Sequence, residues 1–209
     1  MRYLLFGCLA LFFIGCHKTV FKPKWIAEKS PPTYTVRFET TKGKFDVQVQ
    51  REWSPLAADR FYQLVKHKFY DSAIFYRVVP NFVAQFASKD WAISQKWNHF
   101  KIADEPVKHG NNKGSLSFAR SGRETRCDDI FINLKDNTRL DTLYNKGVVG
   151  YPSFGEIVNG LEVVTALYSG YDEKPRTQDT MRYINRQEFF RLFPELDVIK
   201  KAYILRKKT

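Results

Sequence analysis

Two neighbouring segments alternate between apolar and polar side chains, and this alternation constrains the fold more than any other feature of the chain. Large apolar residues stand at every second position of 34–38 and again of 45–49, and a Lys42-Gly43 turn separates the two runs. Successive side chains of a strand point to opposite faces, so a period of two predicts half-buried strands. The short turn between them predicts an antiparallel hairpin.

The rest of the chain repeats short strand signals and offers few helices. Ser54-Pro55 supplies an N-cap and a proline at the first helical position, and apolar residues on one face then predict a helix of about three and a half turns. Further helices are predicted at 161–168 and at 186–193, where Pro194 stops the second. Further strands are predicted at 74–79, 82–86, 115–119, 130–134, 154–158 and 198–204. This pattern predicts one mainly β domain, a barrel or a sandwich.

The N-terminus has the pattern of an export signal. One arginine precedes an apolar run of about a dozen residues, which is too short to span a bilayer and fits a signal-peptide core. The ending Phe13-Ile14-Gly15-Cys16 resembles a bacterial lipobox, although Phe13 stands where leucine is usual. We therefore expect a lipoprotein signal peptide at 1–15, lipidation at Cys16 and a proline-containing tether over 16–33. Plain secretion and an uncleaved anchor are the alternatives.

Charge and cysteine count agree with an envelope location. Loss of residues 1–15 leaves 33 basic against 22 acidic residues, a net charge of +11, which suits a lipid-anchored protein near anionic head groups. Nucleic-acid binding is not expected, because no interleaved aromatic motif accompanies the basic residues. Cys127 would be the one thiol left, so no intrachain disulfide is expected and the thiol is predicted to be inert. Residues 206–209 are predicted to form a solvated basic tail, with membrane-surface contact as the alternative.

Three segments carry the chemistry. They read FYDSAIFYRVVPNFVAQ at 69–85, GSLSFARS at 114–121, and IFINLKDNTRLD at 130–141 followed by FGEIVNGL at 154–161. In this order they resemble the cyclophilin-type peptidyl-prolyl cis-trans isomerases. The resemblance covers about 34–168, and FPELD resembles the C-terminal extension of bacterial members. It implies a closed eight-stranded antiparallel barrel capped by two helices, with a C-terminal extension, as a domain over 34–205.

The resemblance places Arg77 at the position of the catalytic arginine. Rotation about an X–Pro bond has a barrier of about 18–20 kcal/mol, because amide resonance must be broken. The prolyl nitrogen gains a lone pair as it twists, and a permanently charged guanidinium can donate to it. Such a catalyst needs neither a cofactor nor a metal, and the four histidines show no ligand spacing.

The same resemblance assigns the substrate groove. Gln85 would bond the substrate backbone and orient Arg77, and the stretch Ala119-Arg120 would pair with the backbone of the substrate. Tyr144 stands where many members have histidine, but an insertion follows it and leaves this assignment open. The residues implied to line the proline pocket, which composition alone would place in a core, are Phe82, Val83, Phe131 and Leu140.

Two departures from the family pattern bear on activity. Asp129 replaces a glutamine that normally lies near the arginine, and a carboxylate there could pair with Arg77, either orienting the guanidinium or diverting its donors. The segment after Gln85 lacks the usual glycines, so that loop must be rebuilt. The acidic pair Asp104-Glu105 is predicted to begin a loop-to-strand turn.

Two functions therefore stand side by side. The first is an exported isomerase that acts on proline-containing polypeptides during folding in the bacterial cell envelope, facing the periplasm or the exterior. The second is a membrane-anchored module that binds proline-containing peptides, or acts as a chaperone, without turnover.

Overall fold

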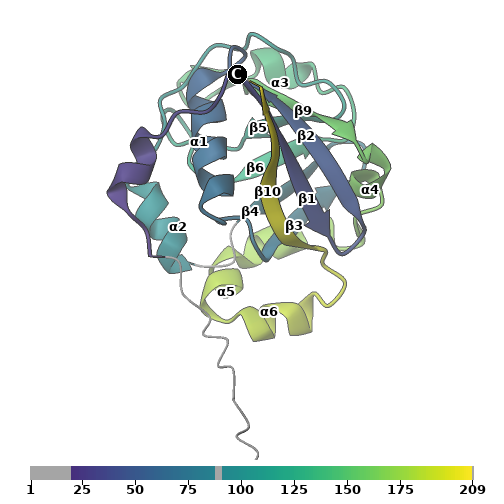
Figure 1. Ribbon diagram of the computed structural model, residues 1–209. Coiled ribbons are helices and arrows are strands. Elements are labelled where there is room, and N and C mark those ends of the chain that lie inside the picture. The colour runs from purple at the N-terminus through teal and green to yellow at the C-terminus, as the bar shows by residue number, and fades with distance from the viewer. Residues whose placement is uncertain (1–19, 88–90, 209) are drawn as a thin grey trace, which may run out of the picture.

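The computed structural model describes residues 20–87 and 91–208, and its centre is a closed antiparallel barrel (Figure 1). Eight strands close in the order β1-β10-β3-β4-β6-β5-β9-β2, which confirms the predicted mainly β barrel. Their bounds are β1 Thr33–Thr40, β2 Lys44–Gln50, β3 Ala73–Val79, β4 Val83–Ala87, β5 Ser115–Phe118, β6 Ile130–Asn133, β9 Ser153–Asn159 and β10 Val198–Lys208. A separate small hairpin joins β7 Tyr144–Asn145 to β8 Val148–Val149.

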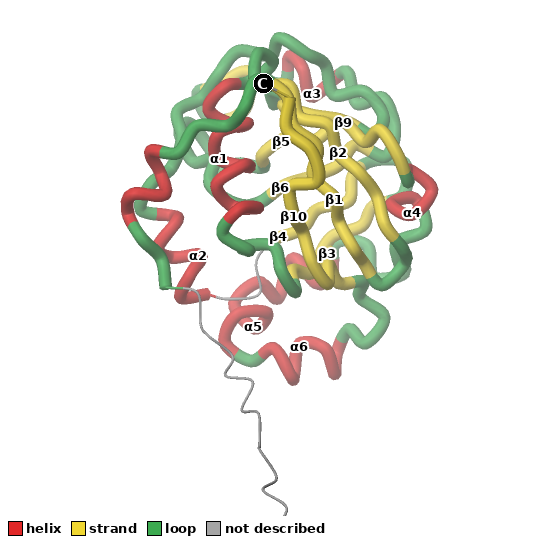
Figure 2. The backbone as a smooth tube through the Cα atoms, in the orientation of Figure 1, coloured by secondary structure: helices red, strands yellow, loops and turns green. Residues whose placement is uncertain are grey.

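Helices surround the barrel rather than forming a layer of their own (Figure 2). Among the described residues, no helix is long and apolar enough to span a bilayer. The helices are α1 Pro55–Lys66, α2 Trp91–Asn98, α3 Arg139–Thr142, α4 Leu161–Thr165, α5 Asp179–Ile184 and α6 Arg186–Leu192, with 3-10 turns η1 Pro23–Ala27 and η2 Lys174–Gln178. The predicted strands and the helix after Ser54 are all present, while α4 ends three residues before the predicted end.

The strand alternation fills the barrel interior. Val36 and Phe38 on β1 face their register partners Val47 and Phe45 on β2, and all four belong to one buried cluster. Phe61 of α1 joins the same cluster, with its ring 5.0 Å from that of Phe154. Because the interior is closed and packed, a peptide can bind only on an outer face of the barrel.

Helix α1 begins where the sequence predicts, but its cap comes from elsewhere in the chain. The side chain of Ser54 does not accept from the helix; its hydroxyl donates to Glu105. The Glu105 carboxylate accepts from the backbone N–H groups of Leu56 at 2.8 Å and Ala57 at 3.2 Å. The carboxylate thus satisfies the helix start, which otherwise leaves N–H groups unpaired. Glu105 therefore caps a helix from a loop. The next strand, β5, begins only at Ser115, so the acidic pair does not lead directly into a strand as predicted.

Both chain ends differ from the predicted tether and tail. Residues 1–19, which include the predicted signal peptide and Cys16, lie outside the described residues. Within the rest of the predicted tether, Trp25 of η1 is buried and stacks on His67, which follows α1, with ring centroids 3.8 Å apart. At the other end β10 continues to Lys208, with Arg206 in register with Thr35, because β1 offers it backbone partners along its whole length. Residues 206–208 are therefore strand rather than a free tail.

The segment between α4 and β10 packs on the outside of the barrel and carries α5 and α6, which Figure 1 shows beyond one end of the strands. We call residues 166–197 the C-terminal segment. A second apolar cluster, separate from the barrel core, holds this segment on β3 and β4. Its buried members are Ile74, Tyr76, Ala87, Phe189, Phe193 and Leu196.

Candidate functional site

The outer faces of β3, β4 and β6 bring together the residues that the sequence singled out. Gln85 lies in register with Arg77 on one side and with Phe131 on the other. Ala84, Phe86, Ile130 and Ile132 alternate with them and belong to the interior cluster. Alternation therefore sends Gln85 and Phe131 to the outer face, where a substrate can reach them.

A register shift in β3 places Arg77 on this face. Phe75 pairs with Phe86 inside the barrel, while Arg77 pairs with Gln85, so Tyr76 is left as an extra residue. Such a bulge bends a strand and re-aims the side chains beside it. Tyr76 packs into the cluster beneath the C-terminal segment, and Arg77 faces the groove side of the sheet.

The four predicted pocket residues form one apolar cluster that is distinct from the barrel core. Val83, Phe131 and Leu140 are its buried members, and Phe82 packs against them. Ala119, Leu143 and Tyr151 complete it. We call this set the outer apolar cluster. It offers a surface of the kind that a pyrrolidine ring needs, at the side of the barrel that carries Arg77.

The guanidinium of Arg77 is held on two sides. Nη1 donates to Oε1 of Gln85 at 3.3 Å, and its central carbon lies 5.3 Å from the centre of the Phe82 ring. Nε donates to Oε1 of Glu173 at 3.1 Å, and Nη2 donates to the same oxygen. The hydrogen bond from Arg77 is the largest of the influences that lower the pKa of Glu173.

The ion-pair partner of Arg77 is thus Glu173. The sequence had raised Asp129 for this role. Asp129 lies at the end of the loop before β6, where its carbonyl accepts from the N–H of Ala119 at 2.9 Å. Within the described part of the chain, the Arg77 guanidinium donates to Glu173 and Gln85. The reason is topological, because the C-terminal segment brings an acid from 96 positions later in the chain to the open side of β3.

A groove of about 810 Å³ runs beside Gln85. Its walls include Ala119, Arg120 and Asp129 on the barrel side and Arg176 and Tyr183 on the C-terminal segment. The side chain of Arg120 is fully buried, with its guanidinium 4.2 Å from the centre of the Tyr151 ring. Burial lowers the pKa of Arg120, and the nearby ring and Asp104 act in the opposite direction.

In the segment after Gln85, where the sequence predicts a rebuilt loop, the described residues Trp91–Asn98 form helix α2. Trp97 anchors the helix in the main core, and Ser94 donates to Asp128 at 2.5 Å. Burial raises the pKa of Asp128 and that of the neighbouring Cys127 thiol. Cys127 is buried and makes no disulfide, and a protonated thiol of this kind is a poor nucleophile.

Tyr144 does not join the predicted site residues. It is 70% exposed on β7 and is absent from the outer apolar cluster. Tyr151 lies there instead, with its ring 5.8 Å from that of Phe131. Sequence reasoning missed both Tyr151 and Glu173. A tyrosine next to Pro152 gave no periodic signal, and nothing local connects residue 173 with residue 77.

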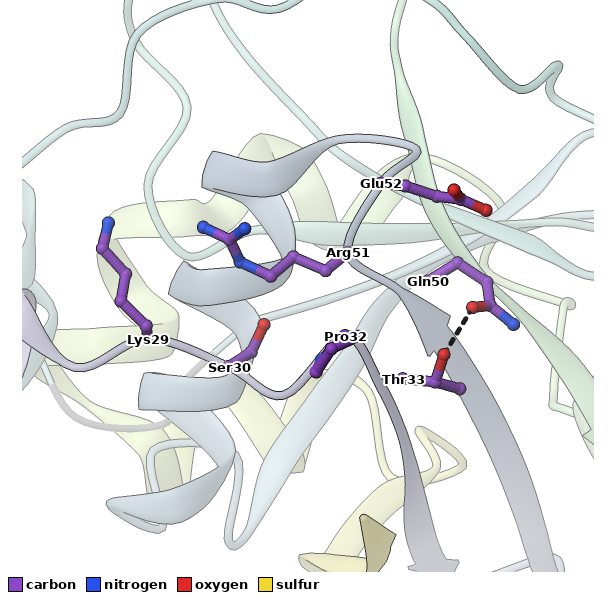
Figure 3. Close-up of a pocket in the computed structure, with 7 residues that line it drawn as sticks. All are labelled: Lys29, Ser30, Pro32, Thr33, Gln50, Arg51 and Glu52. Atoms are coloured by element: carbon purple, nitrogen blue, oxygen red, sulfur yellow. Dashed lines mark hydrogen bonds between the residues drawn. The ribbon is translucent and has the colours of Figure 1, made fainter. Parts of the chain in front are cut away.

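A second hollow of about 560 Å³ lies where the chain enters β1 and leaves β2 (Figure 3). It shares no lining residue with the groove beside Gln85. Thr33 donates across it to Gln50 at 2.7 Å, while Arg51 is tied to Asp59 at 2.8 Å. The two basic residues of this hollow, Lys29 and Arg51, therefore both pair with Asp59 at the entry to the barrel.

Comparison with known proteins identifies relatives over most of the chain. Residues 35–186 match the family model of cyclophilin type peptidyl-prolyl cis-trans isomerases. A peptidyl-prolyl cis-trans isomerase of Acinetobacter baylyi is 30% identical over 62% of this chain and 69% of its own length. Peptidyl-prolyl cis-trans isomerase A of Dickeya dadantii is 30% identical over 69% of this chain and 75% of its own length.

Solved structures share the fold at lower identity. A Cryptosporidium parvum cyclophilin type isomerase aligns with a TM-score of 0.61 at 21% identity, over 84% of this chain and 99% of its own. A second structure of that protein, in the presence of the dipeptide Ala-Pro, aligns with a TM-score of 0.59 at 20% identity, over 83% and 99%.

Proposed function

Because this chain belongs to the cyclophilin-type peptidyl-prolyl cis-trans isomerase family, we propose that it accelerates X–Pro isomerisation through Arg77 and the outer apolar cluster. One observation carries the assignment of the residues. Arg77 lies over the ring of Phe82, a member of the outer apolar cluster, so a strong donor stands at the edge of an apolar surface. The apolar surface can hold the proline ring, and the donor can stabilise the prolyl nitrogen when the amide loses its resonance.

The reaction follows from that arrangement. The pyrrolidine ring packs against Phe131, Val83 and Leu140, while the segment before the proline turns about the amide bond. As the nitrogen becomes pyramidal, Arg77 donates to its new lone pair and stabilises the twisted state more than either planar state. No bond forms or breaks, so neither a nucleophile nor a proton acceptor is needed.

The substrate backbone is proposed to lie along the end of β5. Ala119 directs its N–H to Asp129, which leaves its carbonyl for the substrate. Gln85 bonds Arg77 through Oε1, and its amide NH₂ can donate to a substrate carbonyl. A Cryptosporidium parvum relative studied in the presence of Ala-Pro supports a proline-containing peptide as the ligand class.

Exchange spectroscopy of a short X–Pro peptide tests this proposal. We expect the domain to accelerate exchange and Arg77→Ala to lower kcat/KM about 100-fold, the usual cost of removing one well-placed donor. An Arg77→Ala variant with the rate of the wild type would overturn the assignment.

Binding without turnover is the second candidate, and the Arg77–Glu173 pair is the observation that favours it. A carboxylate on the guanidinium could divert the donors that the prolyl nitrogen needs. Peptide binding measured by titration, together with no acceleration of exchange, would support this candidate.

We also propose that the protein is exported and lipidated at Cys16, so that it serves envelope proteins as they fold. The proposal rests on the sequence pattern of residues 1–16. The mass of protein extracted from membranes tests it, since acyl chains on Cys16 add a defined increment that Cys16→Ser should lack.

A further inference from the structure

We propose that Glu173 of the C-terminal segment is a positioning residue for Arg77. Glu173 holds the Nε–Nη2 edge of the guanidinium, so that a donor at the tip of the group stays directed at the prolyl nitrogen. This inference rests on the proposed isomerase function, and its test separates the two.

The pattern of hydrogen bonds leaves the right donors open. A guanidinium has five N–H groups. Nε and Nη2 each give one to Oε1 of Glu173, and Nη1 gives one to Gln85. One N–H on Nη1 and one on Nη2 remain. Because Glu173 takes the edge formed by Nε and Nη2, the remaining N–H of Nη2 lies at the end of the guanidinium that faces away from its own side chain. The two acceptors therefore fix the plane of the group without using this Nη2 donor at its tip.

Glu173 is itself held in place by its surroundings. Its other oxygen, Oε2, accepts from Nη2 of Arg176 at 2.9 Å. Two residues earlier, the ring of Tyr171 packs on that of Phe193, with centroids 5.2 Å apart, and Phe193 belongs to the buried cluster on β3 and β4. The acid is thus anchored to the sheet that carries Arg77, so it can serve as a fixed reference for the longer arginine side chain.

Exposure indicates that the pair serves orientation rather than folding. The side chain of Glu173 is 42% exposed, while that of Arg77 is 17% exposed. An ion pair with one partner this open to solvent contributes little to stability. Its effect on a flexible side chain is different, because arginine has many rotamers and a catalytic donor must occupy one of them.

Matched substitutions test the proposal. Glu173→Ala should lower kcat five- to twenty-fold with KM within twofold of the wild type, because ground-state binding uses the outer apolar cluster and not this edge of Arg77. Glu173→Gln should lose less, since its amide oxygen still accepts from Nε. The control is Glu188→Gln, which removes a comparable pair with Arg191 in α6, and it should leave both constants unchanged.

A double substitution shows whether Glu173 acts through Arg77. In an Arg77→Ala background, Glu173→Ala should cause no further loss. The Nε–H signal of Arg77 gives a readout free of activity: it should be protected from exchange in the wild type and exposed in Glu173→Ala.

Three results would overturn the inference. A faster Glu173→Ala enzyme would make the acid an inhibitor, and additive losses in the double variant would make it independent of Arg77. An unchanged Nε–H signal would show that the acid does not hold the guanidinium. Failure of the proposed function looks different, because the wild type would then give no acceleration while the Nε–H signal still reported the contact.

Discussion

The barrel and the C-terminal segment contribute to the candidate site around Arg77 and Gln85 in different ways. The barrel supplies the outer apolar cluster, Gln85 and the backbone of Arg77 from strands whose ladders close on themselves. The C-terminal segment supplies Glu173, and its short helices form one wall of the groove beside Gln85. A small apolar cluster holds this segment on the barrel. The large core of the barrel thus stabilises the surface that binds the substrate. The acid that orients the guanidinium is attached through a smaller cluster.

The largest effect should separate the two regions by stability. Phe61→Ala removes a fully buried ring from the barrel core and should cost about 3–5 kcal/mol. Phe189→Ala removes an equally buried ring from the second cluster, but partial collapse there should place its cost near the lower end of that range. Denaturant unfolding measures both.

The variant that loses less stability, Phe189→Ala, should lose more isomerase activity. At a temperature where both remain folded, Phe61→Ala should keep most of the isomerase rate, while Phe189→Ala should lower it by loosening the segment that carries Glu173. Equal activity in the two variants would contradict the proposal that the C-terminal segment affects activity more than the barrel core does.

A second substitution probes how the barrel holds its first helix. Glu105 is 11% exposed and accepts from two backbone N–H groups of α1, from Ser54 and from Arg126. Glu105→Gln removes the charge from these bonds and should cost about 2–3 kcal/mol, as charged hydrogen bonds do. The exposed Glu52→Gln should change the free energy of unfolding by less than about 0.5 kcal/mol. A comparable loss in both variants would show that Glu105 is not the cap.

Sequence periodicity predicted the strands of a barrel or a sandwich because its information is local, and the family resemblance then implied the closed barrel. The alternation of β1 and β2 and the Pro55 helix start follow from neighbouring residues, and the structure confirms them. The end of β10 could not be read in this way, since Arg206 is strand only because Thr35 lies beside it.

The site residues that could be predicted were those at positions covered by the family resemblance. Periodicity alone would have placed Phe131 in the core, because both faces of β6 are apolar and only the ladder tells which face is inside. Glu105 and Glu173 act across 48 or more positions of the chain, and no spacing rule connects an acid to a partner at such a distance. The distant partners of these two acids were therefore what sequence reasoning missed.

A smaller effect should appear at the entry to the barrel as a dependence on pH. Burial acts to raise the pKa of Asp59, but hydrogen bonds from Arg51, Ser30 and Lys29 lower it below its usual value. A carboxyl with a lowered pKa stabilises the fold above its unfolded pKa of about 3.9, and this stabilisation is lost as the pH falls through the folded value.

Asp59→Asn should therefore cost about 1–2 kcal/mol at pH 7, and this difference from the wild type should shrink as the pH falls below about 4. Denaturant unfolding at pH 7, 5 and 3 measures it. A difference that stays constant over this range would show that the cost is one of packing and not of charge.

The smallest effect concerns two tyrosines, Tyr151 in the outer apolar cluster and Tyr144 on β7. Tyr151 packs on Phe131 and under the guanidinium of Arg120, whereas Tyr144 projects from β7. Tyr151→Ala should raise KM for a proline peptide three- to ten-fold, because it removes a wall of the outer apolar cluster. Tyr144→Ala should change kcat and KM by less than twofold. The reverse order would mean that substrate reaches the β7 hairpin, as the family position of Tyr144 implied, and that the outer apolar cluster is not the limit of the binding surface.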